Sequence, residues 1–215
     1  MQLSNGRRSD NVWFGPKKDL INPQAKIGDA VIISKGPAIE TTGLMSTYFP
    51  KFLKAKYGKS LLKRAQDVFF QMSTVKDALI AAGVGGVTAM HDATECGVWG
   101  GLFEIAQQSK VGMHIDLSKI ILPEAVRLTC ACFGIDPYKS ISEGTLLLTA
   151  NPPKAKLIVA ALEKSGIPAS IVGEVTSRSK GLRILDKNKS YELKHPQVDP
   201  FWVKFAEYLK KSRMI

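Results

Sequence analysis

One short stretch, residues 91–96, places several chemically active side chains directly before a glycine-rich segment. His91, Asp92, Glu95 and Cys96 are followed by glycines at positions 97, 100 and 101. A histidine, two carboxylates and a thiol so close together suit a metal site or a nucleophile. Glycines at a helix start suit an anion-binding cradle, or simply a turn.

The spacing disfavours a metal site. Zinc sites usually draw their ligands from two separated pairs, and neither His114 nor His195 has a ligand partner at a matching distance along the chain. Cys130 and Cys132 fall on an expected helix about 200° apart around its axis, so they cannot share one ion. We expect no metal ligands in this chain, and buried structural roles for these two cysteines.

A nucleophilic Cys96 is also disfavoured. The dipole at a helix start lowers the pKa of a thiol, but the negative charge of the adjacent Glu95 raises it. What remains is a strand that ends at 91–92, a turn and a glycine-rich helix start. The glycines suit either a bound phosphate or close helix–sheet packing with Asp92 or Thr94 as the cap, and the residue types leave both open.

The composition is that of a globular protein of 215 residues with a formal charge of +11. Such a charge favours an anionic partner, but the lysines are spread along the chain without interleaved aromatic residues, so we do not expect nucleic acid. The weakly polar run 78–90 is too short for a membrane helix, and three cysteines do not form a disulfide framework. We expect a cytoplasmic protein without a membrane segment.

Strands and helices are expected to alternate along the chain. The hydrophobic patterns predict a polar extension over residues 1–27 and one domain over 28–215. An α+β (α/β layered) fold follows, with three α/β/α layers and a mixed sheet of about six strands. Strands are expected at 29–34, 86–90, 111–115, 144–150, 169–175, 181–185 and 191–193; helices are expected at 40–48, 50–70, 74–82, 98–108, 123–133, 152–164 and 200–211.

Four stretches, in order along the chain, resemble the aminoimidazole ribonucleotide (AIR) synthase superfamily. The stretch at 90–106, MHDATECGVWGGLFEIA, resembles its HD-x-T-x-GG signature and the following helix. The other three are KIGDAVIISKGPAIETTGLM at 26–45, CFGIDPYKSISEGTLLLTA at 132–150 and SIVGEVT at 170–176. The closest resemblance is to HypE-like hydrogenase expression/formation proteins and archaeal AIR-synthase-related proteins.

The resemblance covers only the C-terminal domain of that superfamily. It implies a PurM C-terminal-domain-like fold with partly ferredoxin-like topology. Family members carry a further N-terminal domain that binds ATP and magnesium; residues 1–27 would be at most a remnant of it. ATP and Mg²⁺ would therefore be bound through a missing or partner N-terminal domain and not by this chain alone. The partners implied are an N-terminal-domain chain, a second copy in a homodimer, and a phosphorylated small molecule.

The function implied is the substrate- and phosphate-side domain of an AIR synthase-related, ATP-dependent ligase or phosphotransferase. The alternatives are a non-catalytic binding or assembly module on the same fold and, behind it, a basic nucleic-acid binder. By the resemblance, the catalytic residues are His91, Asp92 and Glu95; the phosphate- and substrate-binding residues are Gly36, Glu40, Thr42, Gly43, Thr94, Gly97, Gly100, Glu143 and Gly144.

Two positions depart from the family pattern. Cys96 stands where the first glycine of the GG pair is usual, and its side chain is expected to narrow the phosphate pocket. The chain ends Ser212-Arg213-Met214-Ile215 and lacks the C-terminal cysteine that the HypE reaction uses, so we do not expect a complete HypE.

Overall fold

Strands and helices alternate along the chain, as the hydrophobic pattern predicts. The computed structural model describes residues 24–213. The strands are β1 (Ala30–Ser34), β2 (Val87–Asp92), β3 (Gly112–Asp116), β4 (Leu146–Ala150), β5 (Ala169–Thr176), β6 (Leu182–Asp186) and β7 (Lys189–Glu192). The helices are α1 (Ile39–Tyr48), α2 (Pro50–Asp67), α3 (Val75–Val84), α4 (Gly97–Ser109), α5 (Glu124–Phe133), α6 (Pro152–Lys164) and α7 (Pro200–Ser212). Three 3₁₀ turns are η2 (Val68–Gln71), η3 (Leu117–Lys119) and η4 (Arg178–Lys180).

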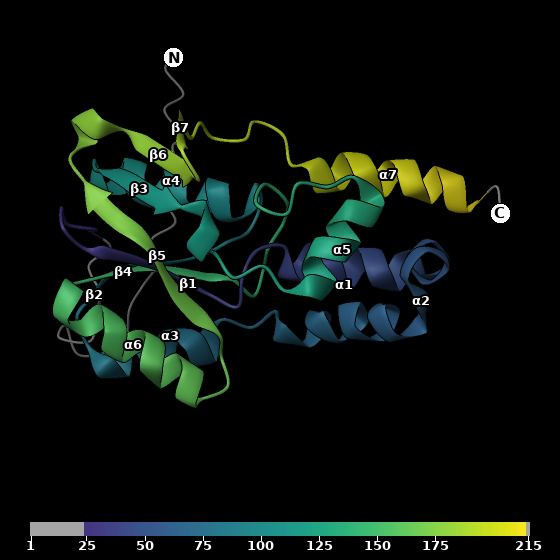
Figure 1. Ribbon diagram of the computed structural model, residues 1–215, viewed down its shortest axis with the longest axis horizontal. Helices are drawn as coiled ribbons and strands as arrows, with labels where there is room; N and C mark the ends of the chain where they lie inside the picture. Colours follow the sequence, from purple (N-terminus) through teal and green to yellow (C-terminus); the bar gives the residue numbers. More distant parts are fainter. Residues whose placement is uncertain (1–23, 214–215) are drawn as a thin grey trace, which may run out of the picture.

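The seven strands form one mixed sheet in the order β2-β4-β1-β5-β3-β6-β7 (Figure 1). All neighbouring strands are antiparallel except β3 and β6, which are parallel. β1 is a central strand, and its run Val31-Ile32-Ile33 is fully buried. Its uninterrupted β-branched sequence fits this place, because helices cover the strand on both faces.

Strands β1, β2, β4 and β5 have a ferredoxin-like arrangement. β4 lies between β1 and β2, and β1 lies between β4 and β5. The crossovers from β1 to β2 and from β4 to β5 bring α3 and α6 together on one face of the sheet. The α4–β3 unit is inserted between β2 and β4 and adds β3 beyond β5. The predicted partly ferredoxin-like topology is thus confirmed.

The two faces of the sheet bury separate hydrophobic clusters, which gives the predicted three layers. On one face, Ile32 and Leu148 pack with Ile158 and Leu162 of α6. On the other face, α4 packs over the sheet; its contributions to that cluster include Val98, Trp99, Leu102 and Ile105.

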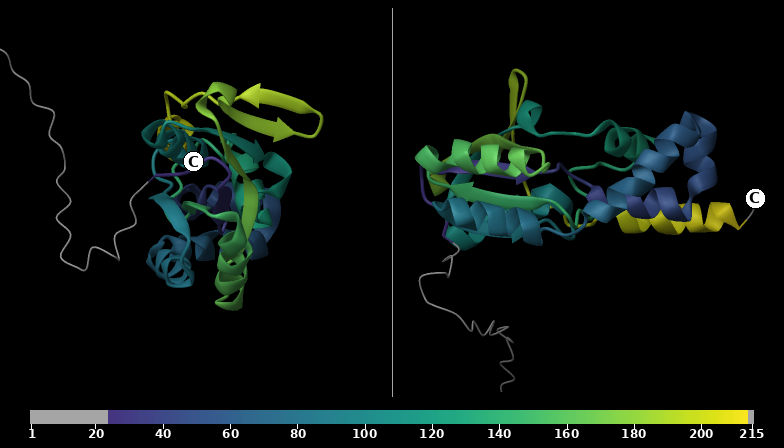
Figure 2. Two further views of the ribbon diagram at one scale, coloured as in Figure 1. Left: turned by 90° about the vertical axis from the view of Figure 1, so that its left-hand side faces the viewer. Right: turned by 90° about the horizontal axis from the view of Figure 1, so that it is seen from below.

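A helical lobe of α1, α2, α5 and α7 lies beyond the end of the sheet (Figures 1 and 2). Its core contains Phe49, Phe133 and Phe201 together with Leu53 and Val126. α5 and α7 turn an apolar face inward, as the periodicity of their sequences indicates, whereas α1 is buried on most sides, including at Thr41 and Thr42.

The helix predicted over residues 50–70 was too long. Gly58 has φ 82° and ψ 175°, a backbone conformation outside the helical region, so α2 consists of two helical pieces separated by a kink. Glycine allows this break because it has no Cβ to clash with the backbone. Residues 68–71 form the separate turn η2.

Most other bounds differ from the predicted ones by one or two residues, and two of them are informative. β2 runs to Asp92, past the range 86–90 but in agreement with a strand that ends at 91–92, so His91 and Asp92 are its last two residues. α3 runs past Gly83 to Val84 and ends at Gly85, whose φ of 77° stops it. Within residues 24–213, no helix has both the length and the apolar character needed to cross a membrane. The extension predicted over residues 1–27 lies almost wholly outside the described residues.

Candidate functional site

Three loops meet at one edge of the sheet. β1 and β2 both run antiparallel to β4, so their carboxyl ends lie beside the amino end of β4. The loops that follow β1 (35–38) and β2 (93–96) therefore meet the loop that precedes β4 (134–145). Each of these loops contains one of the stretches singled out in the sequence, and the carboxyl ends of strands are a common place for binding sites in α/β folds.

Buried hydroxyl groups join the three loops. The Ser142 hydroxyl accepts a hydrogen bond from the Ala38 amide at 2.7 Å and lies 2.8 Å from the Thr145 hydroxyl. Thr145 Oγ1 in turn donates to the Gly36 carbonyl at 2.6 Å. The Ser142 amide donates to the Thr94 carbonyl at 3.3 Å. The loops are thus held in one arrangement by groups of the fold itself.

Carboxyl groups gather at this edge. Glu40 lies in the first turn of α1, half-buried, and its pKa is raised from 4.5 to about 7. Burial is the largest cause, and the negative charges of Glu143, Glu95 and Asp199 add to it. A carboxyl group that titrates near neutral pH is suited to act as a general acid or base.

The start of α4 is held by a carboxylate from far along the chain. The Cys96 amide donates to Asp199 Oδ2 at 2.7 Å, and the Phe201 amide donates to Asp199 Oδ1 at 2.8 Å. Asp199 is 6% exposed and is the N-cap of α7, so one side chain joins the starts of two helices. The Trp99 amide donates to the Tyr138 carbonyl at 3.0 Å. The glycine-rich helix start suggested that such amides bind phosphate. In the structure, the amides of Cys96 and Trp99 instead donate to Asp199 and to the Tyr138 carbonyl of the same chain.

The cap of α4 was not foreseen. We expected Asp92 or Thr94 in that role if the glycines served packing. α4 begins instead on Cys96, whose side chain makes no capping hydrogen bond. Within residues 24–213, the side chain that binds the helix start is Asp199, which lies 103 positions further along the chain. Local sequence patterns do not report contacts over such a separation.

The Cys96 thiol is held in its neutral form. Its Sγ donates to the Pro196 carbonyl at 2.9 Å. Burial raises the pKa of the thiol, and the charges of Asp199, Glu104 and Glu95 raise it further. Since the thiolate is the reactive form, this environment agrees with the expectation that Cys96 is no activated nucleophile.

The glycines of the predicted site allow close packing between loops. A Cβ atom added at Gly36, Gly97 or Gly144 would lie 2.3–2.6 Å from a backbone carbonyl oxygen of another segment. Gly97 also has φ 58°, directly after Cys96 at φ 60°, so α4 starts with two consecutive left-handed residues. Gly100 lies in the first turn of α4, where an added Cβ would approach the Glu95 carbonyl oxygen at 2.9 Å.

His91 and Asp92 are the last two residues of the edge strand β2, directly before the loop 93–96. His91 Nε2 is 2.8 Å from Glu104 Oε2 of α4, and its Nδ1 is 2.5 Å from the Asp92 carbonyl oxygen. Both ring nitrogens thus face oxygen atoms, and the His91 ring links β2 to α4. The Asp92 side chain is exposed.

Thr42 and Gly43 lie inside the helical lobe. Thr42 is fully buried in α1, and a Cβ atom at Gly43 would lie 2.8 Å from the Cβ of Phe69 in η2. The structure therefore brings together one part of the predicted set, namely Gly36, Glu40, Thr94, Glu95, Gly97, Gly100, Glu143 and Gly144. His91 contacts Glu104 instead, the Asp92 side chain is exposed at the end of β2, and Thr42 and Gly43 are buried in the helical lobe.

Two residues of this edge were missed in the sequence. Ser142 is an ordinary loop serine by its type. Asp199 precedes Pro200, and an aspartate followed by proline is a good helix start, so its role as cap of α7 could have been predicted. Its second bond, to α4, has no local signal.

Comparisons with known proteins identify the family and the fold of the chain. Residues 26–185 match the family described as AIR synthase related protein, C-terminal domain. The carbamoyl dehydratase HypE of Rhizobium leguminosarum bv. viciae is 28% identical over 170 residues, which cover 74% of this chain and 44% of that protein. The selenide, water dikinase of Myxococcus xanthus (strain DK1622) is 25% identical over 199 residues, which cover 79% and 54%.

A solved structure has the same fold. The crystal structure of E. coli HypE aligns with a TM-score of 0.68 at 23% identity, over 88% of this chain and 55% of that one. The chain thus spans about half the length of the curated relatives it matches. Because the family match covers most of the chain, this protein belongs to the family described as AIR synthase related protein, C-terminal domain.

Proposed function

We propose that this chain provides the substrate and phosphate side of a HypE-like, ATP-dependent reaction, with an ATP-binding domain of the same family as the other side. The observation that carries the proposal is the gathering of family-motif loops around Glu40, whose pKa lies at about 7. Such a group takes up or gives off a proton at neutral pH when a phosphorylated small molecule lies against these loops.

Among the predicted site residues, three carboxyl groups fit direct roles best. Glu40, Glu95 and Glu143 are close enough for their charges to interact, and Glu143 is exposed. The glycines at positions 36, 97, 100 and 144 would act through the shape of the loops, since each packs against neighbouring backbone or side-chain atoms. His91 would position α4 through Glu104, with Asp92 beside it on the strand.

ATP is proposed to reach this edge on the partner domain. One HypE to which this chain is similar in fold has been solved in complex with ATP. Within residues 24–213, no group of three or more His, Cys, Asp or Glu side chains is arranged to hold a metal ion. We propose that Mg²⁺, like ATP, is held by the partner domain, and we assign no step to magnesium on this chain.

Reconstitution tests the proposal. The chain would be mixed with the separately produced N-terminal half of R. leguminosarum HypE, and ATP hydrolysis followed by phosphate release. We expect hydrolysis only in the mixture, with a pH profile that has an inflection near 7. Glu40→Gln should lower the rate at least tenfold and remove that inflection, whereas Glu163→Gln, an exposed carboxyl group on α6, should change neither.

Other results would point elsewhere. A stable complex without hydrolysis, confirmed by calorimetry with ATP, would favour the alternative of a non-catalytic assembly module. An unchanged pH profile in Glu40→Gln would place the proton transfer on another group.

A further inference from the structure

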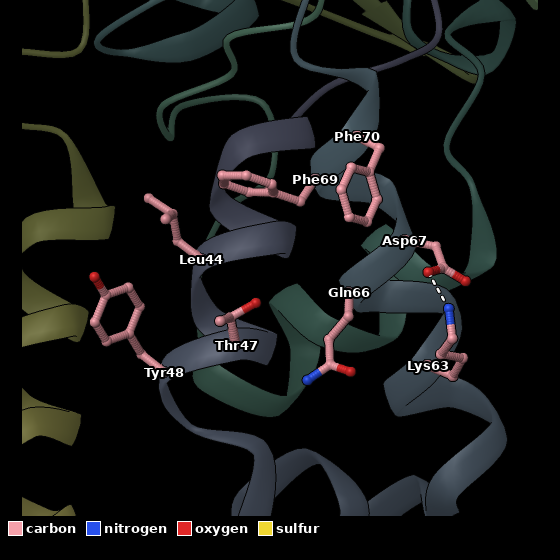
Figure 3. Close-up of a pocket in the computed structure, with 8 residues that line it drawn as sticks. All are labelled: Leu44, Thr47, Tyr48, Lys63, Gln66, Asp67, Phe69 and Phe70. Carbon is pink, nitrogen blue, oxygen red and sulfur yellow. Dashed lines mark hydrogen bonds and ion pairs between the residues drawn. The ribbon is translucent and has the colours of Figure 1, made fainter.

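The outer side of the helical lobe carries an open groove of about 550 Å³ between α1 and the second half of α2 (Figure 3). This volume is in the range of pockets that bind ligands or anchor side chains. The lining is mainly apolar, and it comprises Leu44, Thr47, Tyr48, Lys63, Gln66, Asp67, Phe69 and Phe70.

The aromatic side chains of the groove are unusually exposed. Phe70 is 85% exposed and Tyr48 is 60% exposed, although the core of the same lobe buries other aromatic rings. Exposed large apolar side chains that gather around a hollow typically mark a surface for a partner. Tyr48 also borders a second hollow of about 210 Å³, which includes Lys51 and Phe52.

The shape of the groove is built into the packing of the lobe. Because residue 43 is a glycine, η2 can approach α1 so closely that any Cβ there would lie 2.8 Å from Phe69. Phe69 in turn meets Phe70 edge to face, with ring centroids 6.2 Å apart and planes at 87°. The two rings therefore stand nearly at right angles to each other, with Phe69 packed against α1.

This geometry favours an inserted side chain over other occupants. Single-stranded nucleic acid uses rings that offer parallel stacking platforms, and the Phe69–Phe70 pair does not. A membrane surface takes up the apolar face of an amphipathic helix, whereas this lining is a hollow between elements that also contains the Lys63–Asp67 ion pair. A polypeptide with apolar anchor side chains fits a groove of this kind.

The charge around the groove indicates the chemistry of the partner. α2 contains six basic residues and one acidic residue. Lys63 pairs with Asp67 and Arg64 pairs with Glu124 of α5, so the positive excess of the helix comes from its four other lysines. Lys59 and Lys63 are both exposed and lie one turn apart along the helix, and Lys51 is exposed beside Tyr48. Complementary charge would therefore be negative.

We propose that this groove docks an acidic polypeptide segment of a partner protein. The segment inserts apolar side chains beside Tyr48 and Phe70, and its carboxylates lie opposite Lys51, Lys59 and Lys63.

Peptide selection tests this inference. A displayed library of random 20-residue peptides would be selected on the full chain, with Phe70→Asp as the counter-selection target. Enriched peptides would then be labelled with fluorescein and titrated by fluorescence anisotropy. We expect the selected peptides to be acidic, with apolar residues at regular spacing. Tyr48→Ala or Phe70→Ala should weaken their binding at least tenfold. The double variant Lys59→Glu, Lys63→Glu should also weaken peptide binding at least tenfold. For the wild type, 500 mM NaCl should weaken peptide binding.

Matched variants on α6 serve as controls. Leu157 is 54% exposed and Lys164 is exposed, both away from the groove, so Leu157→Ala and Lys164→Glu should leave binding unchanged. Circular dichroism would verify that all variants are folded.

Three outcomes would overturn the inference. They are a failure to enrich any peptide over the Phe70→Asp target, selected peptides that are neutral or basic, and binding that is indifferent to Tyr48 and Phe70. Binding of a uridine 20-mer, or of vesicles containing phosphatidylserine, that is lost in Phe70→Ala would reassign the groove to nucleic acid or membrane and overturn it as well.

Discussion

Helices α1 and α4 begin in the same way but are held by different groups. Each follows a strand, and each begins after a residue in the left-handed conformation, Ala38 at φ 55° and Cys96 at φ 60°, whose own side chain makes no cap. The start of α1 is bound by the neutral hydroxyl of Ser142. The start of α4 is bound by the carboxyl group of Asp199.

The difference lies in where the negative charge for each helix comes from. α1 has its own acid in the first turn, Glu40, whereas α4 has no acidic residue in its first turn. An ionised acid near a helix start interacts favourably with the positive end of the helix dipole. Around Glu40, burial and the neighbouring carboxylates outweigh this effect and raise the pKa. For α4, the acid is Asp199, which lies directly before α7. Asp199 therefore fixes α4 and α7 relative to each other.

The largest loss of stability is expected at Gly97. This is the second left-handed residue at the start of α4, and α1 has no such second residue. Gly97→Ala places a Cβ 2.4 Å from the Ser140 carbonyl oxygen, at φ 58°. We expect a loss of about 3 kcal/mol or more in the free energy of unfolding, measured by urea denaturation. Gly83→Ala is the matched control, because nothing lies within 4 Å and Gly83 is helical; it should be neutral or slightly stabilising. Equal effects of the two variants would contradict the close approach of the loops.

Removal of the distant carboxyl group comes next. Asp199→Ala leaves two buried amides, those of Cys96 and Phe201, without their acceptor, so we expect a loss of about 2–3 kcal/mol. Hydrogen exchange should show the starts of both α4 and α7 opening more readily. If only α7 changed, the bond to α4 would be of no consequence and the comparison with α1 would fail.

The neutral cap of α1 should matter less. Ser142→Ala removes the acceptor of the Ala38 amide and the contact with Thr145, for an expected loss of about 1–2 kcal/mol by urea denaturation. The effect should be independent of pH between 5 and 8, since no charge is removed. A loss as large as that of Asp199→Ala would show that charge does not distinguish the two helix starts.

Glu40 should make the start of α1 sensitive to pH. Its pKa is raised from 4.5 to about 7, so between these values the folded chain binds more protons than the unfolded chain. Stability should therefore fall as pH rises from 4.5 through 7, and Glu40→Gln should lack this loss. Because Glu40 is only half-buried, we expect about 1 kcal/mol in favour of the variant at pH 8 relative to pH 5. A pH slope in urea denaturation equal to that of Glu163→Gln, its exposed control, would contradict this.

The comparison of the two helices also marks what the sequence can predict. The strands, six of the seven helices and the layers follow from periodicity, because burial on one or both faces leaves a pattern in neighbouring residues. Glu40 could be placed at a helix start in the same way. The break at Gly58 was missed because a single glycine within a helical pattern does not reveal whether the helix bends there.

The site was predictable only in part, for a similar reason. Motif resemblance placed Glu40, Glu95 and Glu143 together, and the structure brings them to one edge. Asp199 could not be predicted there, since its contact with Cys96 depends on how the chain returns after the sheet is complete. The groove beside Tyr48 was missed because its walls come from α1, α2 and η2, none of which is unusual in sequence.

The smallest effect is expected from Cys96→Gly, because two contributions oppose each other. Glycine relieves the left-handed strain at φ 60°, a gain of about 1 kcal/mol, and restores the usual glycine pair of the family. It also removes the bond from Sγ to the Pro196 carbonyl and the packing of a buried side chain, for a similar loss. We expect a net change within about 0.5 kcal/mol by urea denaturation. With Sγ gone, Gln197 and Val198, which lead from Pro196 to Asp199, should exchange their amide hydrogens faster. A stabilisation above about 1 kcal/mol would mean that the thiol adds only strain and that Asp199 alone fixes the start of α4.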